Sequence, residues 1–255
     1  MNHLNLSFAA CGFLGIYHLG AASALLKHGQ KMLKTVRIFA GASAGSLVAA
    51  VMLTAPHKIK ESKDFIFQFS EDVRKQTFGA LTPRYDFLKY LREGIETILP
   101  ANAHDAAQNR LYISVTNTKS WENSLVSSFA SREELVEKWF DGGFSNSLPI
   151  MPTGRTITVS PFSGLQDICP KDKTHADMYI KVANQDMLLS AANFQRISHA
   201  LFPPNQAKME FVFQDGFEDA VNFLHSENWG RRRHRQDDFL DKQNSVIKGF
   251  YGLCK

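Results

Sequence analysis

The chain begins with a short strand-like segment followed by a helical one, and then repeats this order. Leu4 to Phe8 alternates apolar and polar residues, which is the period of a β-strand. From Leu14 to His28 apolar residues recur at helical spacing, and Gly29 stands where a helix commonly ends. Residues 36–40 repeat the strand pattern, and 46–53 form an apolar helix. The order strand, helix, strand, helix predicts a parallel sheet with right-handed crossovers.

The rest of the chain carries further helical and strand patterns without an internal repeat. Apolar spacing predicts helices over about 57–77, 88–98, 178–201 and 213–224, and Ser131 with Glu134 forms a capping box that starts another. Alternation predicts strands over 111–116, 124–129 and 155–159, the first two forming a hairpin. We therefore expect one α/β domain over 1–230, with a mainly parallel sheet sandwiched by helices. Residues 231–255 show little periodicity and are expected to form a basic, disordered tail.

The net charge of +4 comes from the end of the chain alone. Residues 231–255 hold seven basic and three acidic side chains, including the run from Arg231 to Arg235, whereas 1–230 are neutral. A folded body without net charge has no basic field for a polyanion, so we expect no nucleic-acid partner. The basic tail is expected to be solvated, and it would strengthen binding to an anionic lipid surface if it reached one.

No segment has the pattern of a membrane span or a signal peptide. The longest nearly uninterrupted apolar stretch, 44–53, is about half the roughly 20 residues that span a bilayer, and no Lys or Arg precedes Lys27. Cys11, Cys169 and Cys254 are widely spaced and form neither a metal-binding pattern nor a disulfide framework. We therefore expect an intracellular, cytoplasmic protein with no transmembrane segment, metal or other cofactor.

Gly41-x-Ser43-x-Gly45 lies between a predicted strand and a predicted helix, which is the context of a nucleophile elbow. Such a turn exposes the serine oxygen above the sheet, while the flanking glycines let the backbone pack closely. The helix N-terminus that follows favours negative charge. The alternative at this point is a tightly packed turn that carries no chemistry.

Ala10-x-Gly12-x-x-Gly15 forms a second glycine-rich turn between a strand and a helix. A dinucleotide-binding loop would require an acidic residue at the end of the second strand, and that strand ends in Ala40 and Gly41 instead. The competing interpretation is an oxyanion hole, in which the backbone amides of Gly12 and Phe13 point at the oxygen that becomes negative when Ser43 attacks an ester.

A serine nucleophile also needs a base, and the chain offers an aspartate rather than a histidine. Only one strand–helix unit precedes Ser43, so the topology of an α/β-hydrolase does not fit. The histidines show no motif, and His175 and His199 are expected at the surface. Asp141, followed by Gly142 and Gly143, is the better candidate, although an Asp-Gly-Gly sequence alone is typical of a simple turn.

These three pieces together resemble the patatin-like phospholipase family. The stretch from Ser7 to Gly20 is similar to its adiponutrin and adipose triglyceride lipase branch, in particular to a small member that acts on triacylglycerols and retinyl esters. The resemblance runs from about residue 4 to 229. It implies a Ser–Asp dyad, with Ser43 as nucleophile, Asp141 as base and the Gly12 region as oxyanion hole.

The resemblance also implies a reaction and a place. The same acyl-enzyme would support hydrolysis of neutral lipid esters, and of phospholipids, as well as acyl transfer to glycerides or retinol. The substrate would be met at a membrane or a lipid droplet, with the protein peripheral on the droplet or on organelle membranes such as the mitochondrial one. The phenylalanines of the middle helices are candidates to line an acyl groove: Phe65, Phe67, Phe69, Phe78 and Phe87.

The chain departs from the family pattern just before Asp141. Family members carry an additional segment there, including the strand that delivers the aspartate, whereas only residues 130–140 separate Phe129 from Asp141 here. A crossover between parallel strands usually takes a dozen residues or more, so Trp139 and Phe140 form a marginal strand at best. The alternative function is therefore a catalytically impaired, lipid-binding form whose dyad is disrupted by the shortened segment.

Overall fold

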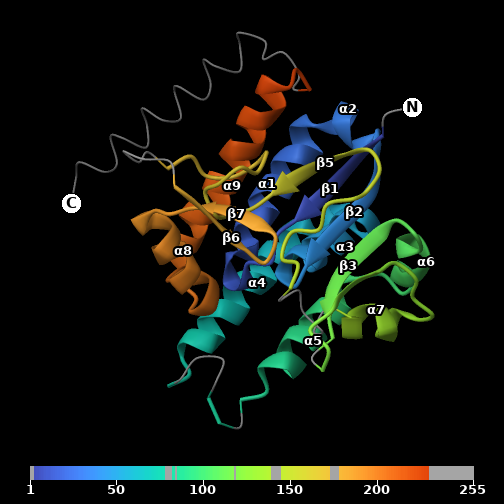
Figure 1. Ribbon diagram of the computed structural model, residues 1–255. Helices are drawn as coiled ribbons and strands as arrows, with labels where there is room; N and C mark the ends of the chain where they lie inside the picture. Colours follow the sequence, from blue (N-terminus) through green and yellow to red (C-terminus); the bar gives the residue numbers. More distant parts are fainter. Residues whose placement is uncertain are drawn as a thin grey trace.

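The computed structural model describes residues 3–77, 82–83, 85–117, 119–138, 145–172 and 178–229. Its centre is a five-stranded sheet with the strand order β4-β3-β2-β1-β5 (Figure 1). Neighbouring strands pair in parallel except β3 with β4, which form the predicted antiparallel hairpin. The strands are β1 (Leu4–Phe8), β2 (Val36–Ala42), β3 (Leu111–Thr116), β4 (Asn123–Val126) and β5 (Arg155–Val159).

Helices flank this sheet, so the α/β class and the mainly parallel sheet are confirmed (Figure 1). Two short 3₁₀ turns, Gly12–Leu14 and Pro56–Lys58, precede α1 and α4. The helices are α1 (Gly15–His28), α2 (Gln30–Leu33), α3 (Ala44–Thr54), α4 (Ile59–Arg74), α5 (Phe87–Ile98), α6 (Ala103–Ala107), α7 (Arg132–Lys138), α8 (Ala191–Leu201) and α9 (Gln206–Ser226). The short helices α2 and α6 were not predicted.

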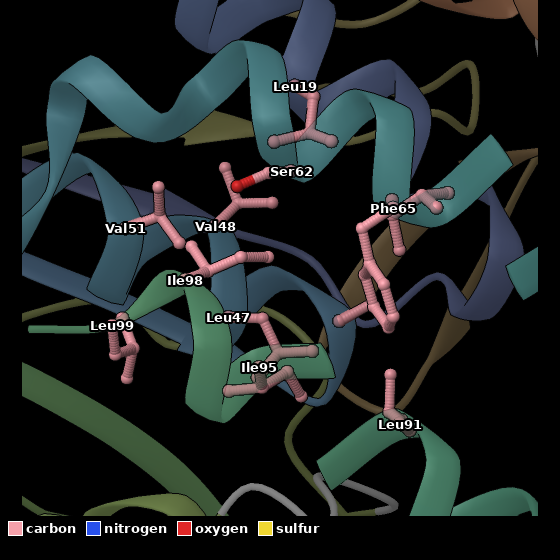
Figure 2. A pocket seen from close by; sticks show the side chains of 13 residues that line it. Leu19, Leu47, Val48, Val51, Ser62, Phe65, Leu91, Ile95, Ile98 and Leu99 are labelled. Atoms are coloured by element: carbon pink, nitrogen blue, oxygen red, sulfur yellow. The ribbon is translucent and has the colours of Figure 1, made fainter. Parts of the chain in front are cut away.

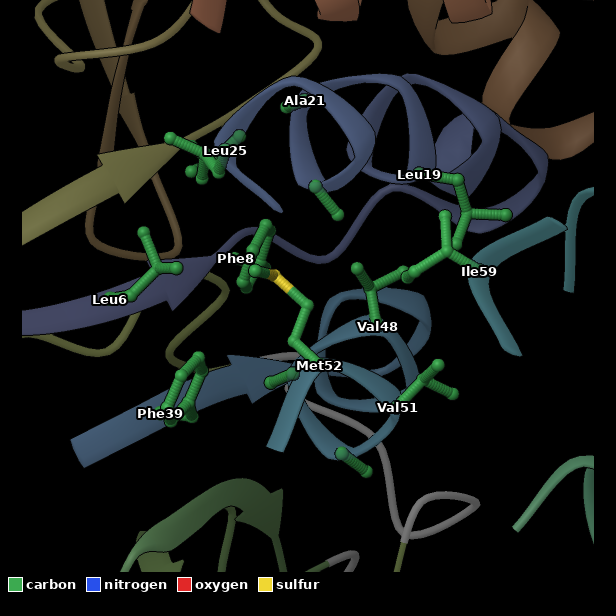
Figure 3. Close-up of a cluster of buried hydrophobic side chains, with 14 of the residues drawn as sticks. Leu6, Phe8, Leu19, Ala21, Leu25, Phe39, Val48, Val51, Met52 and Ile59 are labelled. Carbon is green, nitrogen blue, oxygen red and sulfur yellow. The ribbon is translucent and has the colours of Figure 1, made fainter. Parts of the chain in front are cut away.

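The main hydrophobic core lies between the central strands and the helices α1 and α3. Figure 3 shows Leu6 and Phe8 of β1 meeting Leu25 of α1 and Met52 of α3. These four side chains are at most 5% exposed, so the apolar positions that predicted the first four elements are also the ones that hold them together. Asn5 and Ser7, the polar positions of β1, are buried as well, so both faces of this strand are covered.

The long helix predicted over residues 178–201 is wrong in its first half. That half is a two-stranded hairpin of β6 (Tyr179–Val182) and β7 (Gln185–Leu188), and only the second half is helical, as α8. Ala183 and Asn184 both have positive φ, 45° and 67°, which is the backbone of a two-residue hairpin turn. Asparagine tolerates this conformation, and Ser190 then caps α8 by accepting a hydrogen bond from the Asn193 amide.

The start of α7 follows the predicted capping box. The Ser131 hydroxyl accepts a hydrogen bond from the Glu134 amide, and the Glu134 carboxylate accepts one from the Ala130 amide. The marginal strand predicted at Trp139 and Phe140, the tail 231–255, Phe78, His175 and Cys254 lie outside the described residues. Among the residues described, no helix is long and apolar enough to cross a membrane, and no cluster of metal-binding side chains is found.

Candidate functional site

Ser43 occupies the turn that joins β2 to α3, as the elbow pattern predicts. Its backbone has φ 50° and ψ −127°, a conformation that residues other than glycine rarely adopt. The turn that follows holds Ser43 in this strained conformation, because the Ser43 carbonyl accepts hydrogen bonds from the Ser46 amide at 2.9 Å and the Ser46 hydroxyl at 2.6 Å. The Ser43 side chain is partly exposed, and its hydroxyl makes no hydrogen bond with any part of the chain that the structure describes.

The two glycines of the elbow are required because backbone approaches them closely. A Cβ on Gly41 would lie 2.6 Å from the backbone of Gly45 and Ser46. One on Gly45 would lie 2.3 Å from the carbonyl oxygen of Phe8 and 2.5 Å from that of Ala9. These contacts are impossible for a real side chain, so the elbow can press against the carboxyl end of β1 only with glycine at both positions.

The second glycine turn lies against the elbow. Gly12 has a φ of +52°, and a Cβ there would come 2.2 Å from the carbonyl oxygen of Ala200 in α8. A Cβ on Gly15 would lie 3.3 Å from the Cβ of Ala44, the residue after the elbow serine. Phe13 is buried, and its ring centre lies 6.0 Å from those of Phe69 and Phe87. Within the described residues, no hydrogen bond engages the amides of Gly12 and Phe13.

One buried residue behind the site carries no sequence motif and was not predicted. His18 of α1 is completely buried, and its Nε2 lies 2.8 Å from the Ala9 carbonyl oxygen, so Nε2 carries the proton that it donates. Burial lowers the pKa of His18 to about 4, against an ordinary value of 6.5, so the ring is neutral at pH 7. Because the Ala9 carbonyl also borders Gly45, His18 supports the floor of the elbow.

Asp141, Gly142 and Gly143 lie outside the described residues. The chain on their carboxyl side returns to the same edge of the sheet as Ser43. The Ser145 hydroxyl is 2.9 Å from that of Thr116 at the end of β3, and the Ser147 carbonyl accepts a hydrogen bond of 2.7 Å from the Ala10 amide beyond β1. The segment that follows Asp141 is therefore tied to the carboxyl ends of two strands that flank β2.

An apolar pocket opens beside the elbow, between the helices α1, α3, α4 and α5 (Figure 2). Its lining begins at Gly15 and Ala44 and follows α3 as far as Val51, a distance of about 10 Å at the helical rise. Leu91 and Ile95 of α5 close the other side. The cavity measures about 50 Å³, well below the roughly 300–1,000 Å³ of a typical ligand site. A long acyl chain would therefore enter only if α4 and α5 moved apart.

The phenylalanines expected to line an acyl groove have different environments. Phe65 lines the pocket beside Leu91. Phe69 and Phe87 form a separate cluster with Phe13, which packs them beneath the glycine turn. The Lys63 ammonium lies 5.4 Å from the ring centre of Phe67, so that ring faces a charge and not the pocket.

A serine at a positive-φ turn between a parallel strand and a helix, beside a glycine turn with free amides, is the arrangement of serine acyl hydrolases with a nucleophile elbow. The comparison with protein families identifies the group. The sequence model described as "Patatin-like phospholipase" matches residues 6–136, which include the glycine turn and the elbow. The chain belongs to the patatin-like phospholipase family.

Three relatives illustrate the family. The chain is 56% identical to human patatin-like phospholipase domain-containing protein 4, in a match that covers 90% of this chain and 99% of the human protein. It is 35% identical to mouse patatin-like phospholipase domain-containing protein 2, covering 95% of this chain and 52% of that protein. It is 34% identical to mouse 1-acylglycerol-3-phosphate O-acyltransferase Pnpla3, in a match that covers 86% of this chain and 58% of that protein. The family thus includes proteins named for phospholipase domains and for acyl transfer.

The match with the human protein also bears on the shortened segment. It extends over 251 aligned positions, whereas 90% of this 255-residue chain is about 230 residues. About twenty positions of the human protein therefore face a gap in this chain. A gap of this size agrees with the shortened segment that the resemblance to the family predicts before Asp141.

Proposed function

We propose that this protein is a serine-dependent lipid acyl hydrolase and transacylase that acts on neutral lipid esters such as triacylglycerols and retinyl esters, with phospholipids as further substrates. Ser43 is the nucleophile, Asp141 the base, and the amides of Gly12 and Phe13 the oxyanion hole. The proposal rests chiefly on the strained backbone of Ser43, held at the point where β2, α3 and the glycine turn meet. Strain of about 1–3 kcal/mol persists only where the surroundings enforce it, and it is concentrated at functional sites.

The reaction follows from these roles. The Ser43 oxygen attacks the ester carbonyl carbon while its proton passes to Asp141, and the carbonyl oxygen becomes an oxyanion facing the two amides. The carbon–oxygen bond to the alcohol then breaks, and the departing alcohol takes the proton from Asp141. Water attacks the resulting acyl-serine to give a free fatty acid, or a second alcohol attacks it to give a new ester. One amide donor of this kind is typically worth about 2.7–4 kcal/mol in the transition state.

The chain beyond Asp141 supports its role as the base. Ser145, four residues further along the chain, has its hydroxyl 2.9 Å from that of Thr116 at the end of β3. The Ala10 bond to Ser147 holds the same segment next to the glycine turn. A base must come within roughly 2.6–3.2 Å of the Ser43 hydroxyl, and the two attachments bring the chain that follows Asp141 to the sheet edge at which Ser43 lies.

A lipid substrate is supported by the lining of the pocket and by the relatives. Ser62 is the one polar side chain among the pocket residues, and its hydroxyl is bonded to the Lys58 carbonyl at 2.9 Å. An apolar chain would meet no unpaired polar group there. We infer that the ester is taken from a membrane, including that of mitochondria, or from a lipid droplet. The domain 1–230 would carry the activity. That residues 231–255 form a basic, disordered tail stays a prediction.

The shortened segment favours one alternative, a form that binds lipid without turning it over. Lys138 at the end of α7 precedes Asp141 by only three residues, which leaves no length for the additional strand of the family. In that case Ser43 would keep its elbow and lose its base.

A serine-directed fluorophosphonate distinguishes the two functions. In the proposed enzyme the reagent labels wild type, and Ser43→Ala abolishes labelling together with hydrolysis of a short-chain ester. Asp141→Asn lowers the hydrolysis by at least a hundredfold, since general-base catalysis contributes about 10²–10⁴-fold. The matched controls are Ser226→Ala and Asp64→Asn, which change exposed residues outside the elbow, the glycine turn and the pocket lining and keep full activity.

The other outcomes are equally definite. Folded wild type that takes no label contradicts the enzyme and favours the lipid-binding form. Equal hydrolysis by wild type and Asp141→Asn removes Asp141 from the mechanism. In that case a His18→Gln variant that also retains turnover excludes the buried histidine behind the elbow.

A further inference from the structure

The helix α8 carries its apolar residues on a face that nothing in the described structure covers. Phe194 is 61% exposed, Leu201 64% and Phe202 59%, and Ile197 between them is 37% exposed. Positions 194, 197 and 201 share one side of a helix, so these residues form a continuous apolar stripe. We call these four residues the α8 stripe. An apolar row of this kind is normally the side that a helix buries.

The side chains that attach α8 to the domain are polar. Asn193 is 3% exposed and lies on the neighbouring side of the helix, about 100° away from Phe194. Its amide group donates hydrogen bonds of 2.8 Å to the carbonyls of Ser163 and Leu188, and its oxygen accepts one of 2.9 Å from the Ser163 amide. Arg196 makes two bonds, at 2.7 and 2.8 Å, to the carboxylate of Asp172. This polar anchor fixes α8 to the domain while its apolar side chains remain in solvent.

The exposed apolar surface continues onto the hairpin before α8. Tyr179, Ile180 and Val182 of β6 are all more than 40% exposed, although alternate residues of a strand point to opposite faces. The Leu189 amide bonds to the Met178 carbonyl at 2.7 Å, which joins the start of β6 to the residues that lead into α8. Figure 1 shows α8 beside the β6–β7 hairpin.

The α8 stripe lies next to the proposed active site. Ala200 of α8 is the residue whose carbonyl oxygen approaches Gly12 so closely that only glycine fits there. Ile197 lies about one helical turn before Ala200, and Leu201 directly follows it. A surface that held the stripe would therefore lie beside the glycine turn that precedes the elbow.

The charge around the stripe suits a lipid surface with anionic headgroups. Between Asp186 and Glu210 the chain has no acidic residue, while Arg196, His199 and Lys208 are basic. His199 and Lys208 line a polar cavity of about 160 Å³ under α8, together with Asp215. Burial and the neighbouring Lys208 lower the pKa of His199, and burial raises that of Asp215. Arg196 is paired with Asp172 and the lowered pKa favours neutral His199, so Lys208 is the cation that this cavity offers to an anionic headgroup.

From these observations we propose that the α8 stripe is a lipid-docking surface, which inserts its phenylalanine and leucine side chains among the headgroups of a phospholipid layer and presents the elbow to that layer. The inference rests on the proposed function, because it names the surface from which the ester is taken. A second copy of the chain fits less well. The four side chains of the α8 stripe by themselves offer less than the roughly 800 Å² per partner that a stable dimer buries. Shallow insertion of an amphipathic helix needs no such area.

Vesicle flotation tests the surface without reference to catalysis. The full chain is mixed with phosphatidylcholine vesicles, with and without phosphatidylserine, and the bound fraction is measured for wild type and for the double variant Phe194→Gln, Leu201→Gln. We expect the double variant to bind at least about tenfold more weakly, because it replaces two of the inserted apolar side chains with polar ones. Phosphatidylserine should strengthen the binding of wild type, and added salt should reverse that gain.

The matched control is Trp121→Gln, which removes a 69% exposed aromatic residue at the β3–β4 end, across the sheet from β5 and α8. It should bind vesicles like wild type. The double variant should keep fluorophosphonate labelling and hydrolysis of a soluble short-chain ester, which shows that it is folded. Ser43→Ala should still bind vesicles, so a failure of the proposed catalysis leaves the docking result readable.

Two results would overturn the proposal. One is equal vesicle binding by wild type and the double variant. The other is wild type that binds no vesicle and elutes as a dimer in size-exclusion chromatography with light scattering, while the double variant elutes as a monomer. That result would assign the α8 stripe to a second copy of the chain.

Discussion

The helices α3 and α8 have the same length of eleven residues, and they use their apolar side chains in opposite ways. In α3 seven residues are buried, and they are small or β-branched ones with Met52. In α8 only Asn193 is buried, while Phe194 and Leu201 face solvent. The number of apolar residues in a helix therefore does not say where the helix packs. The difference lies in what each helix presents to its neighbours.

The contrast has a physical cause in the size and polarity of the contact residues. Gly41 and Gly45 let α3 approach β1 and β2 until backbone meets backbone, and this close packing holds Ser43 in its strained turn. Besides the close approach of Ala200 to Gly12, α8 is held by hydrogen bonds and one ion pair, which are directional and need no apolar area. The α3 region is built for rigidity, whereas the α8 region leaves its apolar surface available. Four predictions test this comparison.

The largest expected effect is on α3. Gly45→Ala should lower the free energy of unfolding by about 3 kcal/mol or more, because the added methyl group meets two carbonyl oxygens of the β1 end that cannot move apart. Urea unfolding at pH 7 measures it, and labelling of Ser43 should be lost as well. Gly15→Ala is the control. Its methyl group would meet only the Ala44 side chain at 3.3 Å, so its effect should stay below about 1 kcal/mol.

The second effect concerns His18, which supports the α3 region as a neutral group. Its pKa is lowered from 6.5 in the unfolded chain to about 4 in the folded one, so the unfolded chain binds the proton first. Acidification from pH 6.5 to 4 should therefore remove up to about 3 kcal/mol of stability. Urea midpoints across this range should fall more steeply in wild type than in His18→Gln.

Asp219 acts in the opposite direction over a similar range. Burial raises its pKa to about 6, from an ordinary 3.8, so protonation between these values favours the folded state. The contribution is present in wild type and in His18→Gln alike, and the difference between the two proteins isolates the histidine. If the urea midpoints of wild type and His18→Gln changed with pH in parallel, the titration of His18 would not explain the loss of stability in acid.

The third effect is on the polar anchor of α8. Asn193→Ala should lower the free energy of unfolding by about 2 kcal/mol, since it leaves buried groups of Ser163 and Leu188 without partners. Chemical denaturation compares it with Ser198→Ala, an exposed change in the same helix that should stay within about 0.5 kcal/mol. Equal stabilities of the two variants would mean that the anchor does not hold α8.

The smallest effect is the one that separates the two helices most clearly. Leu201→Gln should change the free energy of unfolding by less than about 0.5 kcal/mol, because the side chain is already in solvent. The matched change in α3, Val48→Thr, buries a hydroxyl group and should lower it by about 1–3 kcal/mol. Thermal unfolding of both variants provides the comparison. A marked loss of stability in Leu201→Gln would show that the α8 stripe packs against the chain itself.

The elements with a clear period could be predicted from the sequence to within a few residues. The pattern of 4–8 and 36–40 corresponds to β1 and β2, and the apolar run 46–53 lies within α3. The error over 178–201 has a definite source. Tyr179 to Leu188 contains enough apolar residues to fit a helical spacing, and the turn at Ala183 and Asn184 lacks the glycine that usually marks a hairpin.

The site was predictable in part. The motif around Ser43 and its position between a strand and a helix identified the elbow before its backbone angles were known. His18 was missed because a single histidine in an apolar helix has no pattern, and its role depends on the Ala9 carbonyl nine residues away. The residue that closes over Gly12, Ala200, comes from the far end of the chain, which periodicity does not report.

The sequence by itself determined the first two strands with the helices that follow them, the glycines of the two turns and the family to which the chain belongs. These features are written in local spacing and in the identity of single residues. Only the tertiary structure decided that α8 turns its polar residues inward and its apolar stripe outward, and that this helix borders the turn before Ser43. Helix burial depends on which partners the other segments supply, and no local pattern contains that information.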